Sequence, residues 1–67
     1  FSATLMPRLL AIADINNNLL VYRAPNWKHQ SYRCQSNIQM AHQLTSNPTS
    51  LYLLDHLSRI SCLDLDS

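Results

Sequence analysis

The amino-acid sequence predicts a mainly α-helical protein with one short extended segment near its middle. Apolar residues recur at helical spacing in residues 4–15 and 48–63. Asn16–Asn18 and the pair Asn47-Pro48 separate these stretches from their neighbours. The order expected is an N-terminal helix, an extended segment with a loop, and a C-terminal helical hairpin. A small α+β domain with a strand at Leu19–Arg23 is the alternative.

The first helix is expected from Thr4 to Ile15. Thr4 is a suitable N-cap, and Pro7 lies in the first turn, where its missing N–H does no harm. One helical stripe contains Leu5, Met6, Leu9, Ile12 and Ala13. Asn16–Asn18 follow, and Asn is the best residue after Gly for the left-handed position that ends a helix.

The middle of the chain has no helical period. Leu19–Tyr22 is a short apolar run that fits a brief strand or a buried extended segment, and Pro25 ends it. Residues 24–34 mix aromatic and basic side chains without any period. We therefore expect a basic aromatic loop over 24–34.

A helical hairpin is expected in the second half of the chain. Its first helix spans Ser36–Thr45, with Met40, Ala41 and Leu44 on a narrow apolar face. Asn47 before Pro48 is typical of a helix start, so the second helix is expected from Pro48 to Leu63.

The last predicted helix is apolar around much of its circumference. Its main stripe is Leu53, Leu54, Leu57 and Ile60. Asp55 and Arg59, four residues apart, are expected to form an ion pair on the opposite side. Residues 64–67 form an acidic tail that we expect to fray. No internal repeat is visible in the sequence.

The size of the chain limits it to a single small domain or subunit over residues 1–67. A domain of this size buries only about 60% of its unfolded surface, so its stability is marginal without partners. Charged residues make up 13% of the chain, fewer than a freely soluble small protein normally carries. Both facts favour a chain that completes its core against another protein.

The net charge of +1 conceals an uneven distribution. Residues 1–33 contain four basic side chains and one acidic side chain, which gives +3. Residues 34–67 contain one basic and three acidic side chains, which gives −2. The first half is therefore basic and the second half acidic.

Gly and Glu are both absent from the sequence. Average usage predicts about five Gly in a chain of this length. Other residues must occupy any backbone position with positive φ, and Gly-rich phosphate-binding loops are excluded. The same gaps are typical of a recent, overprinted or compositionally biased reading frame, or of a fragment of a longer protein.

We expect no metal, cofactor or catalytic site. The possible metal ligands lack the close pairs of zinc sites; they are His29, Cys34, His42, His56 and Cys62. A Cys or Ser nucleophile also needs an oxyanion hole, which commonly uses a Gly-bearing turn. The expectation is a non-enzymatic protein with reduced thiols.

The leading functional hypothesis is an interaction or structural protein. It would be a small accessory subunit, or a fragment, that docks on a larger protein or protein assembly. Apolar and aromatic side chains would make the contact, because such residues dominate protein interfaces. The predicted partner-binding residues are Tyr22, Trp27, Leu53, Leu54, Leu57 and Ile60.

The alternative hypothesis is RNA binding by residues 22–33, which alternate aromatic and basic side chains and contain no acid. Aromatic rings stack on unpaired bases while cations neutralise phosphates. The predicted RNA-binding residues are Arg23, Lys28, Tyr32 and Arg33. A third hypothesis is an overprinted viral or recently arisen protein that binds a host factor.

The sequence also bears on location in the cell. No apolar run approaches the length of about 20 residues needed to cross a membrane, so no membrane span is expected. The Phe-Ser start, and a first stretch that contains Arg8 but no acid, are traits of processed mitochondrial proteins.

Overall fold

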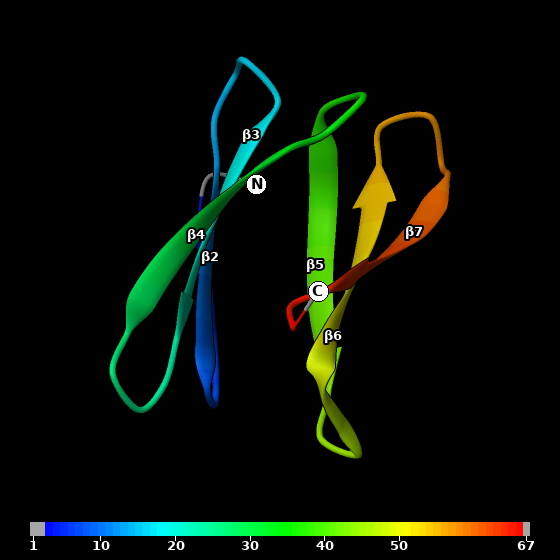
Figure 1. The fold of residues 1–67 in the computed structure, drawn as a ribbon. Helices are drawn as coiled ribbons and strands as arrows, with labels where there is room; N and C mark the ends of the chain where they lie inside the picture. Colours follow the sequence, from blue (N-terminus) through cyan, green and yellow to red (C-terminus); the bar gives the residue numbers. More distant parts are fainter. Residues whose placement is uncertain (1–2, 67) are drawn as a thin grey trace.

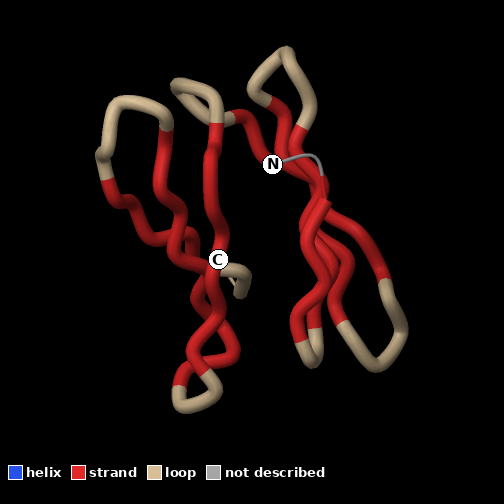
Figure 2. The backbone as a smooth tube through the Cα atoms, turned by 180° about the vertical axis from the view of Figure 1, so that it is seen from behind, coloured by secondary structure: helices blue, strands red, loops and turns tan. Residues whose placement is uncertain are grey.

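The protein is all-β in the computed structural model, which describes residues 3–66 (Figures 1 and 2). These residues form seven antiparallel strands and no helix. The strands are β1 (Ala3–Met6), β2 (Leu9–Ala13), β3 (Asn18–Arg23), β4 (Lys28–Arg33), β5 (Ile38–Leu44), β6 (Asn47–Asp55) and β7 (Ile60–Asp64). Within each sheet, every strand pairs with its neighbour in sequence, which gives a first sheet of order β1-β2-β3-β4 and a second sheet of order β5-β6-β7.

The prediction of a mainly α-helical fold is wrong, and so is the small α+β alternative, because the described residues contain no helix. Residues 4–15 contain β1 and β2, residues 36–45 contain β5, and residues 48–63 contain most of β6 and β7. In β2 and β6 apolar side chains occupy successive positions and therefore both faces of the strand. Such a run matches a helical period as well as a strand period, so spacing alone cannot separate the two structures.

The predicted extended segment at residues 19–22 is confirmed as a strand, but most of the loop predicted over 24–34 is also a strand. The strand of the α+β alternative, Leu19–Arg23, corresponds to β3. Of the predicted loop 24–34, residues 28–33 are strand β4, hydrogen-bonded to β3. The aromatic and basic residues of this segment therefore alternate between the two faces of a sheet.

The turns place three residues other than Gly at positive φ. Asn17 has φ 65°, Trp27 has φ 56° and Ser58 has φ 64°. Asn17 fulfils the expected role of Asn as a substitute for Gly, although in a hairpin and not at a helix end. Ser58 lies within the predicted helix 48–63, where its φ ends any regular helix.

The core lies between the two sheets, which face each other (Figure 1). The buried apolar side chains are Leu9, Ala11, Leu19, Val21, Ile38, Leu51, Leu53 and Leu65. Leu65 is 2% exposed, and its N–H donates to the carbonyl of Thr49 at 2.8 Å. Of the tail that was expected to fray, Asp64 is the last residue of β7 and Leu65 is buried, whereas Ser67 lies outside the described residues.

Residues 8–24 and 49–65 form the same structural unit, 41 positions apart. The pairs from Leu9↔Arg23 to Ala13↔Leu19 in the first sheet correspond to those from Ser50↔Asp64 to Leu54↔Ile60 in the second. The closing hydrogen bond matches as well. Ala24 N–H donates to the carbonyl of Arg8 at 3.0 Å, as Leu65 does to Thr49. The structure thus contains an internal repeat, contrary to the expectation from sequence.

The packing predicts a large loss of stability on truncation of Leu51, which is fully buried in β6. Leu51→Ala should lower the free energy of unfolding by about 2–5 kcal/mol, because it removes apolar contacts and leaves a cavity. Urea denaturation followed by tryptophan fluorescence measures the change. Leu57→Ala, at a side chain that is 58% exposed, is the matched control and should stay within about 0.5 kcal/mol of the wild type. Equal losses for the two variants would contradict the placement of Leu51.

Candidate interaction surface

Two matched aspartates organise the turns that position the exposed faces. The Asp14 carboxylate accepts hydrogen bonds from the N–H groups of Asn16 (2.8 Å) and Asn18 (2.9 Å). In the second unit the Asp55 carboxylate accepts from the N–H groups of Leu57 and Arg59, both at 2.9 Å. Each carboxylate therefore holds a tight hairpin turn without Gly and fixes which side chains of the two strands share a face.

Asp55 also ties its turn to the linker between the sheets. Its Oδ2 atom accepts from Arg59 Nε at 2.8 Å and from the Ser36 hydroxyl at 2.7 Å. Hydrogen bonds, led by that from the Arg59 backbone N–H, lower the pKa of the Asp55 carboxyl below its usual range. The pKa of Asp14 is lowered as well, chiefly by the backbone N–H of Asn18. The predicted Asp55–Arg59 ion pair is thus present, but across a turn and not along a helix.

The second sheet presents an apolar face to solvent. Leu51 and Leu53 of β6 point into the core, so Tyr52 and Leu54, which alternate with them along the strand, point outward. Leu54 is paired with Met40 of β5 on one side and with Ile60 of β7 on the other. Met40 is 61% exposed and Ile60 77%. We call this surface the second-sheet outer face; its members are Met40, Tyr52, Leu54, Ile60 and Cys62, and the exposed His42, which is paired with Tyr52, lies beside them.

The first sheet also presents an apolar face away from the core. Leu10 pairs with Leu5 and Tyr22, and Ile12 pairs with Leu20. All five side chains lie on the side opposite the buried Leu9 and Ala11. The ring of Tyr22 lies 5.2 Å from that of His29 on β4. We call this surface the first-sheet outer face; it consists of Leu5, Leu10, Ile12, Leu20 and Tyr22.

The predicted partner-binding residues do not form one patch. Leu54 and Ile60 lie together on the second-sheet outer face, and Leu57 is exposed in the adjoining turn. Leu53 is 5% exposed in the core, and Tyr22 belongs to the first-sheet outer face. Trp27 is half exposed in the turn between β3 and β4.

Sequence reasoning missed Met40 as an outward-facing neighbour of Leu54 and all of the first-sheet outer face except Tyr22. The signal that could have found both faces is the unbroken apolar run in residues 9–13 and again in 51–54. Such a run is typical of a strand covered on both sides.

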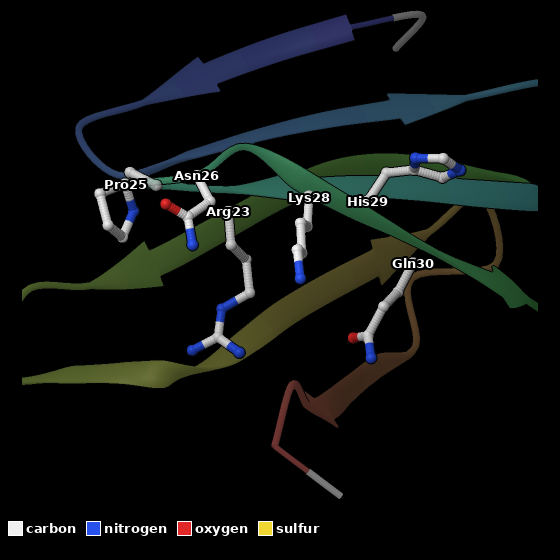
Figure 3. A pocket seen from close by; sticks show the side chains of 7 residues that line it. Arg23, Pro25, Asn26, Lys28, His29 and Gln30 are labelled. Carbon is white, nitrogen blue, oxygen red and sulfur yellow. The ribbon is translucent and has the colours of Figure 1, made fainter.

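The predicted RNA-binding residues are also dispersed. Arg23 Nη1 forms an ion pair with Asp66 at 2.7 Å. Arg23, Lys28 and Gln30 point to one side of the first sheet, whereas His29 points to the other (Figure 3). Arg33 lies five residues from Lys28 on β4 and so faces the side opposite to it. Tyr32 packs against the core, and its hydroxyl is hydrogen-bonded to Gln30.

Hollows lie beside one hairpin turn and between the two sheets. One, of about 380 Å³, is open and lies beside the β3–β4 turn; its lining includes Arg23, Pro25 and Lys28 (Figure 3). The other, of about 490 Å³, lies between the sheets and is lined by Cys34, Asp55, Arg59 and Cys62 among others. Since the Asp55 carboxylate is engaged by Arg59 and Ser36, it has little capacity left for a ligand.

The chemistry of the hollow between the sheets is limited further by its thiols. Both cysteines are free, Cys34 half buried and Cys62 exposed. Burial raises the pKa of the Cys34 thiol, which lowers the thiolate fraction that a nucleophile or metal ligand needs. Residues 3–66 contain no group of three His, Cys, Asp or Glu side chains that could hold a metal ion.

Comparison of the chain with protein-family models, with curated proteins and with solved structures finds no match. Within the described part of the chain, no helix is long and apolar enough to cross a membrane.

The lowered pKa values of Asp14 and Asp55 predict a loss of stability in acid. A carboxyl whose pKa is lower in the folded state stabilises the fold above its unfolded pKa of about 3.9, and this contribution is lost as the pH falls below that value. The midpoint of urea denaturation should thus be nearly constant from pH 7 to 5 and fall between pH 4 and 2.

Asp55→Asn should reduce this dependence on pH more than Asp14→Asn, because Asp55 accepts hydrogen bonds from three residues and Asp14 from two. Equal effects of the two substitutions would contradict the central position of Asp55. A wild type that is no less stable at pH 2.5 than at pH 7 would contradict the role of both carboxylates.

The two thiols should react at different rates. At a protein concentration low enough for the second-sheet outer face to stay uncovered, iodoacetamide at pH 7.5 should modify Cys62 before Cys34, because Cys62 is exposed whereas burial raises the pKa of Cys34. Peptide mass spectrometry at successive times measures the order. In urea the two rates should become similar, which serves as the control. Faster modification of Cys34 in the folded protein would contradict the structure.

Proposed function

We propose that this chain is a non-enzymatic interaction module that docks on another protein through the second-sheet outer face. The observation that carries the proposal is the cross-strand row of Met40, Leu54 and Ile60 on the side away from the core. Apolar side chains in such a row gain free energy, about 25 cal/mol for each Å² removed from water, when a partner covers them.

The composition of the chain supports the same proposal. A chain of 67 residues with eight buried apolar side chains among those described has a small core. Covering a further apolar face adds to that core without any change of fold. The predicted residues Leu54 and Ile60 remain in the proposal, with Leu57 at its margin, whereas Leu53 contributes to the core behind this face.

RNA binding by Arg23, Lys28, Tyr32 and Arg33 has less support. The Arg23 guanidinium is neutralised by Asp66, and Lys28 and Arg33 occupy opposite faces of β4. A strand of RNA held by stacking needs cations and aromatic rings along one track. We therefore place protein docking first.

The test compares an isoleucine on the proposed docking face with an exposed isoleucine in a turn. Ile60→Asp introduces a charge on the second-sheet outer face, whereas Ile15→Asp introduces the same charge in the β2–β3 turn, where the side chain is 90% exposed. Tagged chains are expressed in the native source, and the co-purifying proteins are quantified. A stoichiometric protein should be retained by the wild type and by Ile15→Asp, and reduced at least tenfold by Ile60→Asp.

Two results would overturn the proposal. One is a set of retained proteins that is identical for the two variants. The other is retention of nucleic acid that is released by salt and lost on Lys28→Ala or Arg33→Ala, since salt-dependent release is the signature of phosphate contacts. Thermal unfolding of each variant shows whether the loss of a partner reflects the surface or the fold.

A further inference from the structure

The two repeated units pack on each other with opposite faces. Leu9, Ala11 and Val21 are buried in the first unit, but their matched residues Ser50, Tyr52 and Cys62 lie outside the core. Conversely, Leu51 and Leu53 are buried, whereas their matched residues Leu10 and Ile12 lie on the first-sheet outer face. The first unit therefore buries one face of its hairpin, whereas the second unit buries the opposite face of the matching hairpin.

This inversion distinguishes a series of repeats from a two-fold sandwich. Two halves related by a two-fold axis present the same face to each other, so matched residues would be buried together. Here the contact is heterologous, and each unit has one face for the unit before it and another for the unit after it. Within one copy, the first-sheet outer face has no unit before it and the second-sheet outer face has no unit after it.

The path of the chain between the two sheets is the one expected when sheets are arranged around a common axis. The chain leaves the first sheet from its last strand, β4, and enters the second at its first strand, β5 (Figure 1). Strand β5 also contacts β1 of the first sheet. Sheets that are antiparallel meanders, repeated about every 40–45 residues and stacked face to face, form the blades of β-propellers. The spacing of 41 between the matched residues falls in this range.

We propose that a second copy of this chain supplies the missing contact, with its first-sheet outer face packed on the second-sheet outer face of the first copy. The contact repeats the one already present between the two sheets of one copy. This inference rests on the proposed function and names its partner. Because propellers contain about 4–8 blades, two to four copies would close a ring.

The charge distribution favours this head-to-tail contact over contacts between identical faces. Residues 1–33, which contain the first sheet, carry a net charge of +3, and residues 34–67, which contain the second, carry −2; the Arg23–Asp66 ion pair engages one charge of each half within the copy. Head-to-tail packing brings halves of opposite charge together. Two first sheets, or two second sheets, would instead bring like charges together.

A complementation experiment on the full chain tests the contact. Leu5→Asp introduces a charge on the first-sheet outer face, and Ile60→Asp introduces one on the second-sheet outer face. Both side chains are more than two-thirds exposed, at 73% and 77%, so the fold should tolerate each substitution. Sedimentation velocity measures the mass of the 7.7 kDa chain, alone and in mixtures, at several concentrations.

The expected pattern is specific to a head-to-tail contact. The wild type should form a closed oligomer of two to four copies, and each variant alone should be a monomer. An equimolar mixture should form a dimer with one chain of each variant, because each variant retains the face that the other lacks. Circular dichroism of each variant confirms that it is folded.

Other outcomes separate this inference from the proposed function. Self-association of Leu5→Asp alone, with Ile60→Asp monomeric, would indicate two second sheets in contact; it would overturn the head-to-tail inference and leave the docking face intact. A monomeric wild type would overturn the inference, and the co-purification experiment would then decide the proposed function separately. Two monomeric variants that fail to combine would also overturn the inference.

Discussion

The fold depends on two aspartate side chains that hold turns without Gly. Asn17 and Ser58 adopt left-handed backbone conformations, which cost a residue other than Gly about 1 kcal/mol or more. Asp14 and Asp55 offset this cost by accepting two backbone N–H groups each. A shift of the Asp14 turn by one residue would exchange the two faces of β3 and turn the buried Leu19 and Val21 away from the core.

The repeat is present in the structure but not visible in the sequence. The matched units share their strand register and closing hydrogen bond, which are formed by backbone atoms. Between residues 8–24 and 49–65, only Leu10 with Leu51 and Asp14 with Asp55 are identical. Since the first unit buries one face and the second unit the other, matched positions face different surroundings and accept different residues.

The sequence allowed local features to be predicted, but neither the fold nor the faces. The strand at Leu19–Arg23, the left-handed Asn and the Asp55–Arg59 pair all depend on neighbouring residues, and all three are present. The helices were wrong because strands that are apolar on both faces have no period of two. The predicted patch combined residues that a helix would gather and a strand separates, as Leu53 and Leu54 illustrate.

The inverted burial of the matched units has an evolutionary consequence. When each unit offers one face to its predecessor and the other to its successor, a duplicated segment can join the series without any redesign of its surfaces. Length can then change in steps of one sheet, by tandem duplication or deletion within the gene. In such a series the turn aspartates and the two faces are the positions under constraint, because they fix the strand register and the contact between neighbouring sheets.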